Sequence, residues 1–175
     1  DGTLNNITIG DYITHPDKLT LIPNVADSLR RLREMGFLIV LITNQPVIAR
    51  GEISFDVLNQ IHARLDWLLA EEKAFLDYKF ICPHHPHRGF TGEIAALKGP
   101  CDCRKPQIGL FEQAGQLINI DIENSWMVGD TASDIIAGNT FGLSTCLLSK
   151  EIDAPAHLKV NSIDEFINYL INCNS

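Results

Sequence analysis

Short runs of consecutive apolar residues alternate along the chain with segments whose apolar residues recur every three or four positions. The runs are rich in β-branched residues, which predicts buried parallel strands. They lie at 37–44, 78–82, 125–130 and 143–149. The segments with helical spacing lie at 21–36, 54–72, 109–119, 133–142 and 162–172. Ser54 and Ser162 are predicted N-caps, and Gly36 and Gly142 are predicted C-terminal stops.

This alternation of strands and helices predicts an α/β fold, a Rossmann-like parallel sheet with helices on both faces. At 175 residues, one domain spanning 1–175 is the simplest organisation. Ligands of such sheets bind beyond the carboxyl ends of the strands. The predicted strand ends carry Thr43, Asn44, Cys82 and Asp130, so polar side chains gather where the fold class expects a site.

Composition narrows the class of partner. The net charge of −8 argues against nucleic acid or an anionic membrane surface, because both require clustered Lys and Arg. No apolar stretch is long enough to predict a transmembrane helix. A few local cations or a bound metal can still hold a small phosphorylated molecule. We therefore expect a small-molecule partner and a monomer.

The loop 82–105 is rich in Gly, Pro, His and Cys and is long for a connection inside a compact domain. The chain has five cysteines, an odd number, and three of them are clustered at Cys82, Cys101 and Cys103. This pattern suits a metal site better than disulfides, so we predict a reducing compartment, the cytoplasm. Four protein ligands would leave no position on the metal open for water, so we predict a structural zinc. Its predicted ligands are Cys82, His84, Cys101 and Cys103. His85 and His87 compete for the nitrogen position, and three idle cysteines are the alternative to a metal site.

Several strand-end residues suit phosphate chemistry, although each has a plainer explanation. Asp130 suits Mg²⁺, but it or Ser133 would also serve as a helix cap. The hydroxyl of Thr43 can hold a phosphate, or it can simply end a strand. Arg104 and Lys105 suit phosphate oxygens, or they are solvated surface cations.

Taken in order, the segments Asp1-Gly2-Thr3, Thr43-Asn44, Lys105-Pro106 and Gly129-Asp130-x-x-x-Asp134 resemble the four motifs of the haloacid dehalogenase (HAD) superfamily of phosphotransferases. The first motif of that superfamily reads Asp-x-Asp-Gly-Thr, and Asp1 matches its second aspartate. The resemblance therefore implies that the nucleophilic aspartate and the first strand lie upstream of residue 1.

The stretches CPHHP, CDCRKP and TNQPVIARG resemble more specifically the zinc-loop members, the heptose bisphosphate phosphatases and the related histidinol-phosphate phosphatases. Pro46 and Val47 stand where the heptose phosphatases usually have Ser-Gly, and Thr131 stands where Lys or Arg is frequent. A bisphosphate requires a second anion site, which Arg104 beside the zinc loop could supply and which histidinol phosphate does not need. This argument, with the run Ile48-Ala49-Arg50-Gly51 and the long zinc loop, favours the heptose phosphatases. The alternatives are a histidinol-phosphate phosphatase, a promiscuous sugar phosphatase, or a non-catalytic zinc-stabilised module.

The resemblance also implies residue roles. Catalysis would involve Asp1, Thr43 and Lys105, and substrate binding Asn44, Arg50 and Arg104. Mg²⁺ would be held at Asp1, Asp130 and Asp134. Asp134 would orient either the ligands of the metal or the side chain of Lys105. Zn²⁺ would be held by the four loop residues given above. Arg50 has the alternative role of an ion pair at a helix start.

Overall fold

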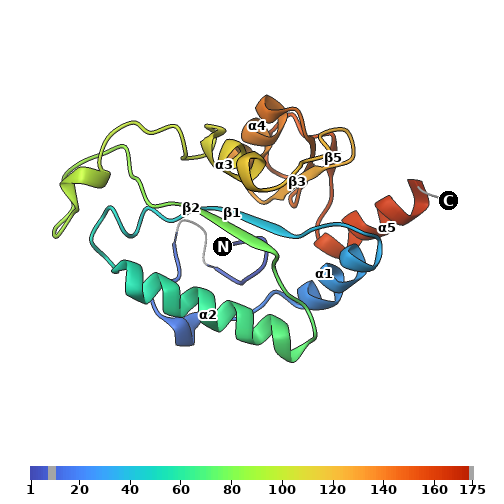
Figure 1. The fold of residues 1–175 in the computed structure, drawn as a ribbon, viewed down its shortest axis with the longest axis horizontal. Helices are drawn as coiled ribbons and strands as arrows, with labels where there is room; N and C mark the ends of the chain where they lie inside the picture. The colour runs from blue at the N-terminus through green and yellow to red at the C-terminus, as the bar shows by residue number, and fades with distance from the viewer. Residues whose placement is uncertain (8–10, 174–175) are drawn as a thin grey trace.

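The computed structural model describes residues 1–7 and 11–173 (Figure 1). Its strands are β1 (Val40–Asn44), β2 (Tyr78–Cys82), β3 (Trp126–Gly129), β4 (Ser144–Leu147) and β5 (Leu158–Lys159). Its α-helices are α1 (Val25–Glu34), α2 (Phe55–Glu71), α3 (Gly109–Leu117), α4 (Ala132–Phe141) and α5 (Ile163–Cys173). Two short 3₁₀ helices, η1 (Pro16–Lys18) and η2 (Ala95–Leu97), lie in the connections.

All strand pairs are parallel, as predicted. β1 pairs with β2 from Val40 opposite Tyr78 to Asn44 opposite Cys82. β3, β4 and β5 form a second parallel group in that order. Parallel strands need crossover connections. α2 supplies the one between β1 and β2, and α4 the one between β3 and β4, whereas residues 148–157 join β4 to β5 without a helix. The α/β prediction is therefore confirmed, with the strands divided between two sheets.

Alternate residues of β1 and β2 face different helices, so the two strands are covered on both faces. Leu41 and Ile81 pack with the α2 side of the core. Ile42 and Phe80 pack instead with Leu110 of α3. Figure 1 shows α2 below this strand pair and α3 above it. The two-residue period of a strand thus buries the continuous apolar run that the sequence shows.

The helices begin and end where side chains satisfy their free backbone groups. Ser54 accepts a hydrogen bond from the Val57 amide and caps α2, as predicted. Ser162 accepts from the Glu165 amide at the start of α5. Along α2 the buried residues share one face, and each contributes about 1.5–3 kcal/mol of apolar burial. They are Leu58, Ile61, Leu65 and Leu69.

The structure corrects several details of the predicted elements. α1 begins at Val25, four residues later than predicted. β1 begins at Val40, three residues later than predicted. β5 was not predicted, because a two-residue strand has no measurable period. The cap of α4 is Thr131, not Asp130 or Ser133. Its hydroxyl and its amide pair with Asp134 in a capping box.

A cavity of about 690 Å³ separates the two sheets. Strands β1 and β3 both line it, with residues such as Val40, Ile42, Trp126 and Val128. These four side chains are only partly buried, which is unusual for the apolar strands of a doubly covered sheet. The cavity runs along the two facing strands and contains, at their carboxyl ends, the polar residues that the sequence singles out.

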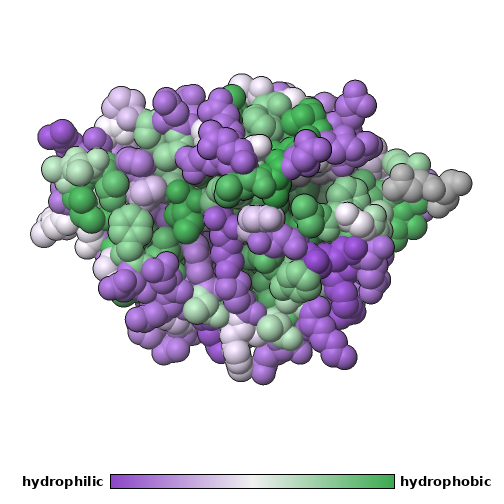
Figure 2. All heavy atoms as spheres, viewed as in Figure 1, coloured by the Kyte–Doolittle hydropathy of each residue, from purple (hydrophilic) through white to green (hydrophobic). Residues whose placement is uncertain are grey.

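Apolar and polar residues are interspersed on the face shown in Figure 2, with apolar groups most frequent across its middle. Among the described residues, every helix is too short or too polar to cross a membrane.

Candidate active site

The ends of both sheets bring four predicted site residues into one cavity. Asp1, Thr43, Lys105 and Asp130 all line the space between β1 and β3. Thr43 comes from β1 itself, and Asp130 follows β3 directly. Segments that are 129 residues apart in sequence therefore meet, as the strand-end argument predicts.

Amide donors fix the carboxylate of Asp1. Its Oδ1 accepts from the side-chain amide of Asn5 at 2.9 Å, and its Oδ2 accepts from that of Gln45 at 3.2 Å. Gln45 also donates to the hydroxyl of Thr43 at 3.1 Å. The sequence reasoning missed both amides. Their positions, four residues after Asp1 and directly after the Thr43-Asn44 strand end, are the signal that could have identified them.

Asp130 lies against the turn that carries Gly2 and Thr3. The Thr3 hydroxyl donates to Asp130 at 2.9 Å. Gly2 has φ +78°, and a Cβ there would lie 2.0 Å from the Asp130 carboxylate. Burial raises the pKa of Asp130, and the negative charge of Asp134 adds to that effect. A cation bound here would offset both the cost of burying the Asp130 charge and its repulsion from Asp134, so the arrangement suits a cation site.

Lys105 and Asp134 form a buried ion pair at 2.6 Å, with side chains 8% and 7% exposed. The ammonium also donates to the Ile42 carbonyl at 2.6 Å. The other carboxylate oxygen of Asp134 accepts from the Thr131 amide and hydroxyl at 3.0 and 2.7 Å. Both oxygens of Asp134 are thus engaged within the protein. These contacts favour the role of Asp134 in orienting Lys105 over direct metal ligation. Both roles stay predictions.

Asn44 holds the backbone of Lys105 from both sides. Its side-chain amide donates to the Lys105 carbonyl at 3.1 Å and accepts from the Lys105 amide at 3.0 Å. The side chain of Asn44 is therefore used to position Lys105. Its predicted contact with substrate would have to come from its backbone.

The predicted zinc ligands converge at the base of the loop. Cys82, His84, Cys101 and Cys103 place one ligand atom each within 4.8 Å of one another. The thiol of Cys101 lies 3.8 Å from that of Cys82 and 3.6 Å from that of Cys103. Thiolates about 2.3 Å from a tetrahedral Zn²⁺ lie roughly 3.8 Å apart. The donor set therefore fits zinc, although the sulfurs of Cys82 and Cys103 are closer, at 2.9 Å.

The remaining loop histidines have other partners. The Nδ1 of His85 lies 3.0 Å from the His87 carbonyl and accepts from the His87 amide at 3.1 Å. Neither ring belongs to the four-residue cluster. Burial raises the pKa of the Cys82 and Cys103 thiols, so a cation is needed to hold them as thiolates.

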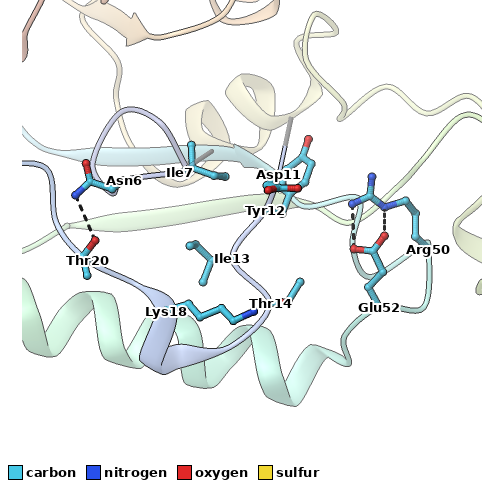
Figure 3. A pocket seen from close by; sticks show the side chains of 10 residues that line it. All are labelled: Asn6, Ile7, Asp11, Tyr12, Ile13, Thr14, Lys18, Thr20, Arg50 and Glu52. Atoms are coloured by element: carbon cyan, nitrogen blue, oxygen red, sulfur yellow. Dashed lines mark hydrogen bonds and ion pairs between the residues drawn. The ribbon is translucent and has the colours of Figure 1, made fainter. Parts of the chain in front are cut away.

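The two predicted substrate arginines lie outside the central cavity. Arg104 donates to the His84 carbonyl at 3.3 Å, which ties it to the metal cluster. Arg50 lines a neighbouring cavity of about 830 Å³ (Figure 3), where it forms an ion pair with Glu52. Arg50 thus forms an ion pair of the kind given as the alternative to substrate binding, and its contact with substrate stays a prediction. Tyr12 and Ile13 line both cavities, so the two spaces adjoin.

Comparisons with known proteins agree with this geometry. A HAD-hydrolase-like family model matches residues 102–172. The chain is 38% identical to the D-glycero-β-D-manno-heptose-1,7-bisphosphate 7-phosphatase of Haemophilus ducreyi, over 97% of this chain and 94% of that protein. The enzyme of the same name from Haemophilus influenzae is 45% identical, over 79% of this chain and 71% of that protein.

A solved structure with a similar fold is the D,D-heptose 1,7-bisphosphate phosphatase from B. bronchiseptica, complexed with magnesium and phosphate. Its TM-score is 0.82 at 25% identity, covering 98% of this chain and 94% of that one.

Proposed function

Because the chain belongs to the D-glycero-β-D-manno-heptose-1,7-bisphosphate 7-phosphatases of the HAD superfamily, we propose that it removes the 7-phosphate of that heptose bisphosphate. The observation that carries the proposal is the meeting of Asp1, Thr43, Lys105 and Asp130 around one cavity. That cavity holds the acids and the cation that phosphoryl transfer requires.

The proposal includes a nucleophilic aspartate two residues before Asp1, at the end of a strand between β1 and β3. One feature supports this: the cavity between those strands is lined by their apolar side chains, such as Ile42 and Val128.

In the first step, the upstream carboxylate attacks phosphorus, and the bond from phosphorus to the C7 oxygen breaks. Asp1 donates its proton to the departing sugar oxygen. Thr43 and Lys105 contact the phosphoryl oxygens while negative charge spreads over them. Asn44 and Asp134 hold Lys105 at its backbone and its ammonium, so this cation needs no rearrangement during the reaction.

In the second step, Asp1 takes a proton from a water molecule that attacks the phosphorus of the aspartyl phosphate. The bond from phosphorus to the aspartate oxygen breaks, which releases inorganic phosphate and restores the nucleophile. The amides of Asn5 and Gln45 keep the carboxylate of Asp1 in one place for both proton transfers.

Two metals complete the proposal. Asp130, the backbone carbonyl of Asp1 and the upstream aspartate would hold Mg²⁺, which when bound offsets the phosphoryl charge. Cys82, His84, Cys101 and Cys103 would hold Zn²⁺ in a structural role, since a four-ligand set is closed to water. We place the enzyme in the cytoplasm as a monomer, where a reducing environment keeps these thiols free.

The test is phosphate release by the full-length protein from heptose 1,7-bisphosphate, with Mg²⁺ and after its removal. We expect Mg²⁺-dependent release of one phosphate and loss of turnover in Asp1→Asn. Histidinol phosphate serves as the competing substrate. Equal or faster turnover of histidinol phosphate would assign the second family, and release that persists without any divalent cation would contradict the mechanism.

A further inference from the structure

Gln45 is a buried side chain that donates to two residues of the site at once. It follows β1 directly, and only 5% of it is exposed. Its amide nitrogen donates to the Oδ2 of Asp1 at 3.2 Å and to the Oγ1 of Thr43 at 3.1 Å. A glutamine amide has two N–H donors, so both are used on groups that the proposed reaction employs.

The two donated bonds set the orientation of this amide. Among the described residues, the Oε1 of Gln45 is buried and has no hydrogen-bond partner. Leaving a buried acceptor unpaired costs about 1–3 kcal/mol. Turning the amide over would place this oxygen against the carboxylate oxygens of Asp1 and would remove a donor from them. The amide therefore faces the site with its nitrogen.

The backbone around Gln45 leaves this residue little freedom. Its N–H donates to the Cys82 carbonyl at 2.7 Å, and its carbonyl accepts from the Ile48 amide at 3.3 Å. Pro46 follows, and the residue before a proline is restricted to extended conformations. The strand that carries a predicted zinc ligand therefore fixes the point from which the Gln45 side chain reaches the site.

The bond from Gln45 limits what the hydroxyl of Thr43 can do. A hydroxyl has one proton to donate and accepts through its lone pairs. Within residues 1–7 and 11–173, the Gln45 amide is the one hydrogen-bond partner of the Thr43 oxygen, which accepts in that bond. The hydroxyl proton cannot point back at a donor. It is therefore directed to another acceptor in the cavity that Thr43 lines.

The backbone that follows cannot replace this hydroxyl as a donor. The N–H of Gln45 is engaged by the Cys82 carbonyl, and Pro46 has no N–H. The turn after Thr43 and Asn44 thus begins with two positions that offer no backbone donor to an anion. The direction of the single Thr43 proton matters more for this reason.

We propose that Gln45 is a positioning residue that turns the hydroxyl proton of Thr43 toward the transferring phosphoryl group. The same amide holds Asp1, so one side chain sets both the donor to a phosphoryl oxygen and the acid that protonates the sugar oxygen. The inference rests on the proposed function and deepens it, because it adds a residue that acts on the reaction without touching substrate.

A double-mutant cycle tests the link from Gln45 to Thr43. Gln45→Met removes the amide at similar length, and Thr43→Val removes the hydroxyl at similar shape. Alone, Gln45→Met should lower kcat/KM for heptose 1,7-bisphosphate about 10- to 100-fold. In the Thr43→Val enzyme the same change should cost about three- to tenfold less, because the proton that Gln45 directs is already absent. Losses that simply multiply would overturn the inference.

Inhibition by orthovanadate separates Thr43 from Asp1. Vanadate adopts the five-coordinate geometry of the transferring phosphoryl group and carries no sugar that needs a proton. Gln45→Met should weaken this inhibition about three- to tenfold, the loss expected for one hydrogen bond. Asn5→Leu removes the other amide that donates to Asp1 and leaves the Thr43 hydroxyl as it is. It should lower kcat/KM but weaken vanadate less than Gln45→Met does.

Gln45→Glu is a second variant that keeps the size and polarity of the side chain. Its carboxylate offers Thr43 an acceptor in place of a donor, so the hydroxyl proton would turn away from the phosphoryl group. It should weaken vanadate at least as much as Gln45→Met. Gln113→Met is the matched control, because Gln113 is an exposed glutamine of α3 that lines neither cavity, and it should behave as the wild type.

Urea unfolding and zinc content, measured for every variant, separate a loss of fold from a loss of positioning. Vanadate inhibition that stays at the wild-type level in both Gln45 variants would show that Gln45 acts on Asp1 alone, and would overturn the inference. A wild type that releases no phosphate from the bisphosphate in the presence of Mg²⁺ would instead overturn the proposed function itself.

Discussion

The ammonium of Lys105 and the carboxylate of Asp134 lie 2.6 Å apart in a place that solvent scarcely reaches. In Asp134→Asn the ammonium would remain buried without a counter-charge, which costs about 3 kcal/mol of stability. The displaced cation should also lower kcat about 10- to 100-fold. Urea unfolding and steady-state kinetics on the same preparation measure the two effects.

Thr131→Ala separates the ion pair from the helix cap. It removes the hydroxyl that donates to Asp134 but leaves the contact with Lys105. We expect a loss of about 1 kcal/mol, as for other N-caps, and a kcat much closer to wild type. An Asp134→Asn enzyme that is as active as Thr131→Ala would contradict the positioning role of Asp134.

Gly2→Ala should disturb Asp130 through direct contact. The new Cβ would lie 2.0 Å from the Asp130 carboxylate, and the positive φ adds backbone strain. We expect weaker Mg²⁺ activation, measured as a higher Mg²⁺ concentration at half-maximal rate. Gly36→Ala is the control, because Gly36 has φ +92° but no atom within 4 Å of its Cβ position. It should lose stability without any change in the response to Mg²⁺.

Cys103→Ala should abolish zinc binding, since three ligands then remain of the four. Metal analysis should give one zinc per wild-type chain and far less in the variant, together with a lower Tm. Exposed Cys173 provides the control, and Cys173→Ala should retain both zinc and Tm. Equal zinc content in the two variants would exclude this cluster as the zinc site.

His62 should make the fold sensitive to acid. Burial, together with the charge of Lys79, lowers its pKa from 6.5 to about 4. The unfolded chain then binds a proton at higher pH than the folded one, so stability is lost as pH falls from about 6.5 to about 4 and changes no further below that. His62→Gln should remove up to about 3 kcal/mol of this loss.

Unfolding at pH 7 and pH 4.5 measures the effect. His15→Gln, at an exposed histidine, is the matched control. An unchanged difference in His62→Gln would show that the carboxylates alone govern acid unfolding.

The sequence predicted the long elements because their periods reflect burial. Apolar residues three and four apart in α2 face the core, and the consecutive apolar run in β1 is covered by helices on both faces. β5 has only two residues and is held partly through side chains, since His157 and Thr145 exchange backbone-to-side-chain hydrogen bonds beside it. Such contacts between segments leave no local pattern.

The same distinction applies to the site. Charged and metal-binding residues were found from their types and spacing, because phosphate and zinc chemistry require them. The amides of Asn5 and Gln45 and the hydroxyl of Thr3 were missed, because common polar residues acquire a role only when the fold places them beside Asp1 and Asp130. The engagement of Asp134 by Lys105 likewise depends on a contact between distant segments.

Cys103 and Lys105 are separated by a single residue, so a sulfur of the metal cluster and the cation proposed for the reacting phosphate are carried by the same few bonds of backbone. Loss of zinc would free this short tether at one end, while Asn44 and Asp134 still hold it at the other. The supply of a trace element would therefore bear on how firmly the cation for a sugar phosphate is held, because without zinc Lys105 would be held by Asn44, Asp134 and the Ile42 carbonyl.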